Sequence, residues 1–153
     1  MKKAKLLGEI LMNKEKLLLE AEYADIILSL LCPPYSITST TKLVFIAFCV
    51  KHESNVSAYK NRSKDFIDVF FKNISLKLSA HYDEIECIFH FIDILKKTSK
   101  VNIEGDYIEL TTETQHSSEN NFLQFCAKKV PNPIVEINKL DAKALLEEVI
   151  RYV

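Results

Sequence analysis

Residues 83–110 read DEIECIFHFIDILKKTSKVNIEGDYIEL. This stretch decides the fold because the spacing of its apolar residues changes once, from every third or fourth position to every second position. Its first part, 83–97, is predicted to be a helix, with Asp83 and Glu84 at the positive end of the helix dipole and lysines at the negative end. The inward face is predicted from apolar residues three or four positions apart, which are Ile85, Ile88, Phe89, Ile92 and Leu95.

The rest of the stretch, 101–110, is predicted to be a β-hairpin, because apolar and polar residues alternate about Gly105-Asp106. The pairs that face each other across this turn should be Val101 with Leu110 and Ile103 with Ile108. Two helices followed by a hairpin give the order of the second half of a winged helix, with the hairpin as the wing. We therefore expect a mainly α fold with one β-hairpin, that is, a winged-helix-like core plus N- and C-terminal helices.

Upstream of this stretch, the chain is predicted to be helical in three places. A helix over 3–31, which Asn13 could interrupt, should end before Pro33-Pro34. Its inward face is predicted to hold Leu17, Ala21, Ala24, Leu28 and Leu31. Residues 43–51 are apolar all round and should form a buried central helix, capped by the Ser and Thr cluster at 36–41. After a polar loop, a third helix starts near Ser63 and buries Ile67, Phe70, Phe71, Ile74 and Leu78.

Downstream of the hairpin, a polar loop over 111–121 should lead to a short helix or strand that Pro131 and Pro133 end. Asp141 is predicted to cap a terminal helix that packs on the chain's own core. The alternative is that this helix docks on a partner through Leu145, Leu146, Val149, Ile150 and Tyr152. The chain is expected to be a single domain, 1–153, with N-terminal helices in 3–51, the winged-helix-like core in 40–111 and a C-terminal helical extension in 117–153.

The composition indicates a folded protein without a strong charge field. Among 153 residues, 20 Lys and Arg stand against 21 Asp and Glu, a formal net charge of -1, so the global cationic field of a non-specific nucleic-acid binder is absent. The 4 cysteines are widely spread, which predicts reduced thiols and a cytoplasmic protein. The apolar stretches are too short or too charged to predict a membrane span, and the charged start argues against a secretory signal.

The chemistry-bearing residues do not predict an enzyme. Gly8 and Gly105 are too few for a P-loop or a dinucleotide fingerprint, and no serine lies in a nucleophile elbow. Two C-x-x-H pairs, Cys49 with His52 and Cys87 with His90, could together complete a zinc site. Buried thiols beside surface histidines are the favoured interpretation. We therefore predict no catalytic residue, no metal, no cofactor and no small-molecule substrate.

A basic surface is predicted before and along the third helix. Its members are Lys51, Lys60, Arg62, Lys64, Lys72 and Lys77. Asp65 and Asp68 lie among them, so an ordinary solvated helix face is favoured over a phosphate-binding one. The helix over 83–97, which a DNA-reading winged helix would place in the major groove, is acidic, so base readout through this helix is disfavoured.

Three stretches carry a resemblance to a known family. They are NRSKDFIDVF at 61–70, SAHYDEI at 79–85 and VPNPI at 130–134. In these stretches the chain resembles the middle components of bacterial ABC three-component systems, which include the small accessory subunit of Lamassu-type anti-phage defence.

This resemblance implies a non-catalytic accessory subunit that assembles with an SMC-like ATPase and a nuclease-type effector in a complex that senses foreign DNA. The ATPase and nuclease chemistry would then belong to the partners. On this basis we expect an adaptor that docks on the ATPase and restrains or positions the effector, with at most non-specific DNA contact. The alternative is a winged-helix DNA-binding regulator that uses the basic surface between Lys51 and Lys77.

Overall fold

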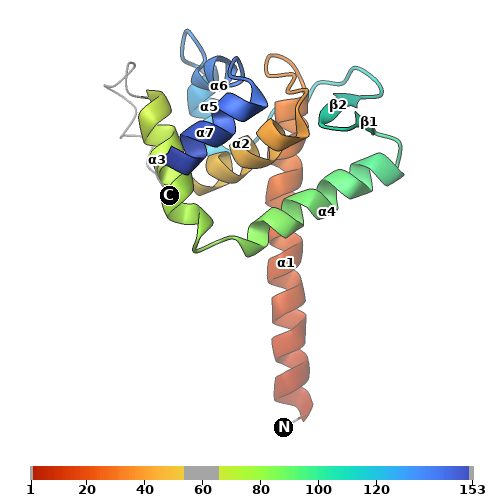
Figure 1. The fold of residues 1–153 in the computed structure, drawn as a ribbon. Coiled ribbons are helices and arrows are strands. Elements are labelled where there is room, and N and C mark those ends of the chain that lie inside the picture. Colours follow the sequence, from red (N-terminus) through yellow and green to blue (C-terminus); the bar gives the residue numbers. More distant parts are fainter. Residues whose placement is uncertain (1, 54–65, 152–153) are drawn as a thin grey trace.

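The computed structural model describes residues 2–53 and 66–151. Within them the fold is mainly helical, with one two-stranded antiparallel hairpin and helices on both sides of it in sequence (Figure 1). This confirms the predicted fold class. In chain order the elements are α1 (Lys2–Leu31), α2 (Thr40–His52), α3 (Phe66–Leu78), α4 (Asp83–Lys97), β1 (Val101–Glu104), β2 (Tyr107–Leu110), α5 (Asn121–Ala127), α6 (Pro133–Ile137) and α7 (Ala142–Arg151).

We call the described residues other than 2–18 the body. Helix α2 is the buried centre of the body, as predicted. Ser39 is its N-cap, and the Ser39 hydroxyl accepts a hydrogen bond from the backbone N–H of Lys42. Its buried residues run almost without a gap along the helix and are Leu43, Val44, Ile46, Ala47, Phe48, Cys49 and Val50. Helices α1, α3, α4, α5 and α7 all pack against it, so burial on every side explains the absence of a polar face.

The β-hairpin has the predicted register, with Val101 opposite Leu110 and Ile103 opposite Ile108. Its turn is fastened to the start of α2, because the Asp106 carboxylate accepts hydrogen bonds from the backbone N–H (2.9 Å) and the hydroxyl (2.7 Å) of Thr41. A carboxylate at a helix N-terminus also suits the helix dipole. The hairpin is therefore part of the body and not a free wing.

Helix α1 is continuous from Lys2 to Leu31, so the interruption considered at Asn13 does not occur. Its buried face matches the predicted one only in part. Tyr23, Ile26, Ile27 and Leu30 enter the core, and so does Leu31 of the predicted set, whereas Leu17 is 65% exposed. The prediction was wrong for Leu17 because α1 carries apolar residues on two opposite sides, and α2 and α4 cover the side that holds Tyr23 and Ile27.

Helix α4 begins and ends where the sequence predicts, but one inward residue was wrong. Ile88, Ile92 and Leu95 are buried, whereas Phe89 is 51% exposed. The buried face also contains Glu84, four residues before Ile88. At about 100° per residue this face is centred about a quarter turn away from Phe89, and Phe91 lies at its edge instead.

The C-terminal extension packs on the body through α7. Leu145 and Val149 are buried, α7 contacts α3 and α2, and the Asp141 carboxylate caps the helix by accepting from the Ala144 N–H at 2.7 Å. Packing on the chain's own core is therefore confirmed. Helix α6 was missed, because Pro133 starts it after the Asn132 N-cap, a position where proline favours a helix.

Candidate functional site

Among the described residues, the largest group of exposed apolar side chains lies on the part of α1 that projects from the body. We call residues 2–18 the stalk; in Figure 1 it runs away from the other helices to the N-terminus. Six large apolar side chains among the described ones of the stalk are each between 53% and 65% exposed, and we call these six the stripe. They are Leu6, Leu7, Ile10, Leu11, Leu17 and Leu18. A solvent-exposed helix gains nothing by displaying such residues, so the stripe requires an explanation.

The stripe lies on one side of α1. At 3.6 residues per turn its six members fall within an arc of about 140°, on the opposite side from Tyr23 and Ile27, which enter the core. Lys14 falls inside the arc and is exposed. The spacing repeats after seven residues, from Leu7 to Lys14 and from Ile10 to Leu17, which is the spacing of helices that pack along one another.

Where the same side of α1 enters the body, the chain covers it with its own loop. Asp25 lies in line with Leu7 and Leu18 on the helix. Its carboxylate accepts hydrogen bonds from Ser118 Oγ (2.6 Å), His116 Nε2 (2.7 Å) and the Glu119 N–H (3.1 Å). Burial alone would raise the pKa of Asp25, but the hydrogen bonds from Ser118 and His116 lower it overall.

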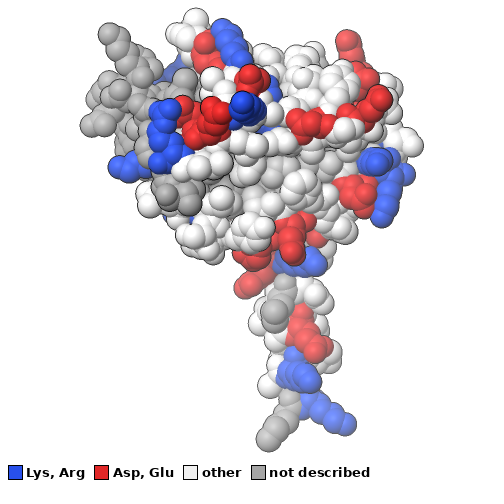
Figure 2. Space-filling model, viewed as in Figure 1, with Lys and Arg blue, Asp and Glu red and all other residues white. Residues whose placement is uncertain are grey.

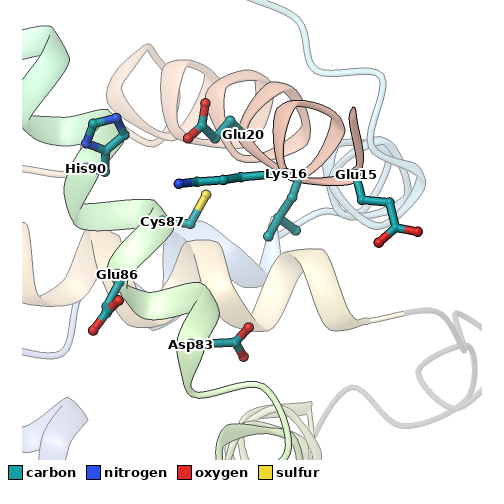
Figure 3. A pocket seen from close by; sticks show the side chains of 8 residues that line it. Glu15, Lys16, Glu20, Asp83, Glu86, Cys87 and His90 are labelled. Carbon is teal, nitrogen blue, oxygen red and sulfur yellow. The ribbon is translucent and has the colours of Figure 1, made fainter. Parts of the chain in front are cut away.

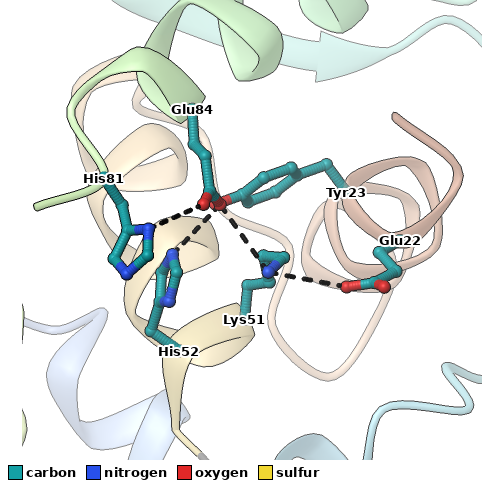
Figure 4. Close-up of polar contacts among 6 residues, drawn as sticks. All are labelled: Glu22, Tyr23, Lys51, His52, His81 and Glu84. Atoms are coloured by element: carbon teal, nitrogen blue, oxygen red, sulfur yellow. Dashed lines mark hydrogen bonds and ion pairs between the residues drawn. The ribbon is translucent and has the colours of Figure 1, made fainter. Parts of the chain in front are cut away.

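A polar cluster lies at the root of the stalk, which we call the Glu84 centre (Figure 4). Its members are Tyr23, Lys51, His52, His81 and Glu84. The Glu84 residue is only 7% exposed, and its Oε1 accepts from the Tyr23 hydroxyl at 2.7 Å. A buried carboxylate needs such partners because desolvation of an unpaired charge is costly.

Two histidines approach the same carboxylate from different elements. His52 Nε2, from α2, lies 3.0 Å from Glu84 Oε1, and His81 Nδ1, from the turn before α4, lies 3.3 Å from Oε2. The two rings face each other with centroids 4.5 Å apart. Burial lowers the pKa of His52, an effect that the nearby Glu84 opposes. Burial, and next the hydrogen bond to Glu84, raise the pKa of Tyr23 far above its ordinary value.

The predicted basic surface is only partly within the described residues. The Lys51 ammonium lies 3.7 Å from both Glu22 and Glu84 and its side chain is 19% exposed, so it serves ion pairs inside the fold. Lys72 and Lys77 are exposed on α3. The remaining members, Lys60, Arg62 and Lys64, lie outside the described residues, as does Tyr152 of the predicted docking set. Figure 2 shows basic and acidic side chains interspersed over the visible face of the body.

The rest of the predicted docking set divides between core and surface. Leu145 is fully buried and Val149 is 4% exposed, whereas Ile150 is 67% exposed. Leu146 is half-buried. Most of this helix face is therefore used by the chain's own core, and the stalk presents more apolar surface than α7 does.

The two C-x-x-H pairs do not come together. The Cys49 thiol is buried and donates to the Phe70 carbonyl at 3.5 Å, and burial raises its pKa well above the ordinary value. Cys87 and the exposed His90 line a shallow pocket between α4 and the stalk (Figure 3). The expected surface position is right for His90 and wrong for His52, whose side chain is 10% exposed.

Among the described residues, the side chains that do gather with metal-ligating atoms are His52, His81 and Glu84. Sequence reasoning missed this group because His81 and Glu84 meet His52 only through the packing of α4 on α2. The usable signal was Glu84 itself, an acidic residue at a position that continues the apolar face of Ile88 and Leu95.

Comparisons with known proteins leave the function to be argued from this geometry. No protein-family model, no curated protein and no solved structure matches the chain. In the part of the chain that the structure describes, the helices lack the combination of length and apolar character that a bilayer span needs.

Proposed function

We propose that the chain is a non-catalytic adaptor that docks on a helix of a larger cytoplasmic protein machine through the stripe on its stalk. The observation that carries this proposal is the exposure of six large apolar side chains on one side of a helix that leaves the body. Large exposed apolar patches mark interaction surfaces, and a row along a straight helix suits another helix better than it suits a small ligand.

The spacing of the stripe supports a helical partner. A seven-residue repeat lets two helices stay in register along their length, and each apolar side chain inserts between residues of the facing helix. Lys14 interrupts the stripe at one of these repeat positions. A single polar residue at such a position favours partners that can accept it and so adds specificity at some cost in affinity.

The charges of the stalk favour a partner helix of uneven charge. The tip carries Lys2, Lys3 and Lys5, and Figure 2 shows basic side chains toward this end. Nearer the body, Lys14 and Lys16 flank Glu15, and the acidic residues Glu20 and Glu22 follow where α1 enters the body. A partner with acidic residues beside the tip and basic residues beside the body would be steered into one direction of approach.

An SMC-like ATPase provides such a partner. The coiled coils of this class offer long exposed helices, and the resemblance to the middle components of bacterial ABC three-component systems supports this assignment. The body of the adaptor would then hold or position a nuclease-type effector. The burial of Lys51 in ion pairs with Glu22 and Glu84 favours this function over DNA binding through the basic surface.

Co-purification with the proteins encoded beside this chain tests the proposal. The variant Ile10→Lys with Leu17→Lys puts two charges into the stripe, and the control Glu104→Gln with Glu113→Gln changes the net charge equally at exposed positions outside α1. We expect the stripe variant to weaken binding to the ATPase by about 30-fold or more, the effect of losing a typical interface anchor. The control should bind like the wild type.

Equal binding by both variants would overturn the proposal. Light scattering on the isolated chain adds a second readout. A wild-type dimer that the stripe variant converts to a monomer would assign the stripe to a second copy of this chain and not to the ATPase. That outcome would also contradict the proposal.

A further inference from the structure

We propose that His52, His81 and Glu84 bind a divalent transition-metal ion, with Zn²⁺ the best fit. The site lies at the root of the stalk and is independent of the docking function. Its three side chains offer two imidazole nitrogens and one carboxylate oxygen, and these ligand atoms all lie within 4.8 Å of one another. This proposal departs from the sequence-based prediction of no metal site, because two of the three residues fall outside the C-x-x-H pairs.

The distances suit a small ion. Zn²⁺ binds nitrogen and oxygen ligands at about 2.0–2.1 Å, so ligand atoms around a tetrahedral ion lie about 3.3 Å apart. His81 Nδ1 lies 3.3 Å from Glu84 Oε2, and His52 Nε2 lies 3.0 Å from Glu84 Oε1. These two contacts use different oxygens of Glu84, and the ligand atoms of the group lie up to 4.8 Å from one another. Side-chain rotations that bring them closer by at most about 1.5 Å would admit an ion between the three groups.

The surroundings hold the ligands in place. The Tyr23 hydroxyl donates to Glu84 Oε1 at 2.7 Å, which fixes the carboxylate and leaves Oε2 toward His81. The ring of Phe48 lies 4.6 Å from that of His52 and restricts its rotation. Figure 4 shows both imidazoles with a nitrogen directed at the carboxylate. Such supporting contacts orient ligands and raise metal affinity.

The composition of the site selects the class of ion. Two imidazoles and a carboxylate are a common set for Zn²⁺ with water in the fourth position, whereas Mg²⁺ and Ca²⁺ prefer oxygen ligands alone. The His81 side chain is 42% exposed, so solvent can reach the site and provide the fourth ligand. The Lys51 ammonium lies 3.7 Å from Glu84 and would repel a bound cation. Glu22, whose side chain is 61% exposed, is a second ion-pair partner that can hold this ammonium away from the ion.

Zn²⁺ titration of the full-length chain after treatment with a chelator tests the proposal. We expect one equivalent to bind and the thermal midpoint to rise, because an ion that binds only the folded state stabilises it. His81→Gln keeps a polar side chain at a half-exposed position and should lower affinity by about 100-fold, at least the effect of losing a residue that merely supports a ligand. His90→Gln, an exposed histidine on α4, is the matched control and should bind Zn²⁺ like the wild type.

Co²⁺ in place of Zn²⁺ gives a spectroscopic readout that does not depend on stability. The proposed ligand set has no thiolate, so the visible absorption of tetrahedral Co²⁺ should appear without a strong sulfur-to-metal band in the near ultraviolet. Three results would overturn the proposal: no binding by the wild type, binding that His81→Gln leaves unchanged, or a thiolate band, which would assign the ion to Cys49 or Cys87.

Discussion

Both ends of α1 carry large apolar side chains, but these side chains have opposite environments. In the C-terminal end, Tyr23 and Ile27 are fully buried against α2 and α4. In the N-terminal end, Leu11 is 59% exposed and Leu17 65% exposed. The two apolar faces also lie on opposite sides of the helix. One helix can therefore serve the chain's own core with one face and present the other to a partner.

The difference in burial predicts the largest stability effect for the C-terminal end. Ile27→Ala removes a fully buried side chain and should lower the free energy of unfolding by about 2–5 kcal/mol, through lost burial and the cavity left behind. Urea unfolding at neutral pH measures this change. A loss below about 1 kcal/mol would mean that α1 is not part of the core.

Tyr23 lies where the two ends of α1 meet, and its hydroxyl is predicted to have the next largest effect. Tyr23→Phe keeps the ring but removes the donor to the buried Glu84 carboxylate. We expect a loss of about 1–3 kcal/mol, since the carboxylate keeps its desolvation cost with one partner fewer. The matched control is Tyr107→Phe, which removes an exposed hydroxyl that donates to Glu109; urea unfolding should not distinguish it from the wild type.

Asp25 lies on the same side of α1 as the stripe but, unlike the stripe, it is covered by the loop that holds His116 and Ser118. Asp25→Asn replaces a carboxylate that accepts from Ser118, His116 and Glu119, and should cost about 1 kcal/mol at pH 7. The pKa of Asp25 is lowered in the folded chain. Its contribution is therefore present above the unfolded value near pH 4 and is lost as the pH falls through the folded value.

Urea unfolding of the wild type and the variant across pH 7 to pH 3 checks this prediction. The difference in the free energy of unfolding between the wild type and Asp25→Asn should narrow steadily below about pH 4. A gap that stays constant at low pH would show that the charge of Asp25 does not matter, and that only the shape of its side chain does.

The smallest effect on stability is predicted for the stripe. Leu17→Ala shortens a side chain that is 65% exposed, so the free energy of unfolding should change by less than about 0.5 kcal/mol. Ile27→Ala, a similar truncation in the same helix, provides the contrast. If the two substitutions cost the same, the stripe is buried in solution and the stalk folds back on the body or on another copy.

The sequence predicts α4 and the hairpin well because their signals are local. Acidic residues, a three-and-four period and terminal lysines define Asp83–Lys97, and alternation about Gly105 sets the register of the strands. The helical character of α1 was equally plain. Its inward face was not, because a periodic pattern with two apolar sides does not say which of them the neighbours cover.

The Glu84 centre was beyond sequence reasoning for a different reason. His52, His81 and Tyr23 are separated by long stretches of chain and meet only because α4 packs on both α1 and α2. The same packing uses Lys51 in internal ion pairs. The sequence analysis placed that lysine on a basic surface, because the sequence does not reveal which charged side chains form ion pairs inside the fold.

The straight, continuous geometry of α1 also has a mechanical consequence. From Lys2 to Tyr23 a rigid helix measures about 30 Å, at 1.5 Å per residue. A tilt of about 10° at the root would then carry the tip through about 5 Å. A force applied by a partner at the N-terminus would therefore act as a torque on the contacts that hold the C-terminal end of α1 in the body, among them the Tyr23–Glu84 hydrogen bond.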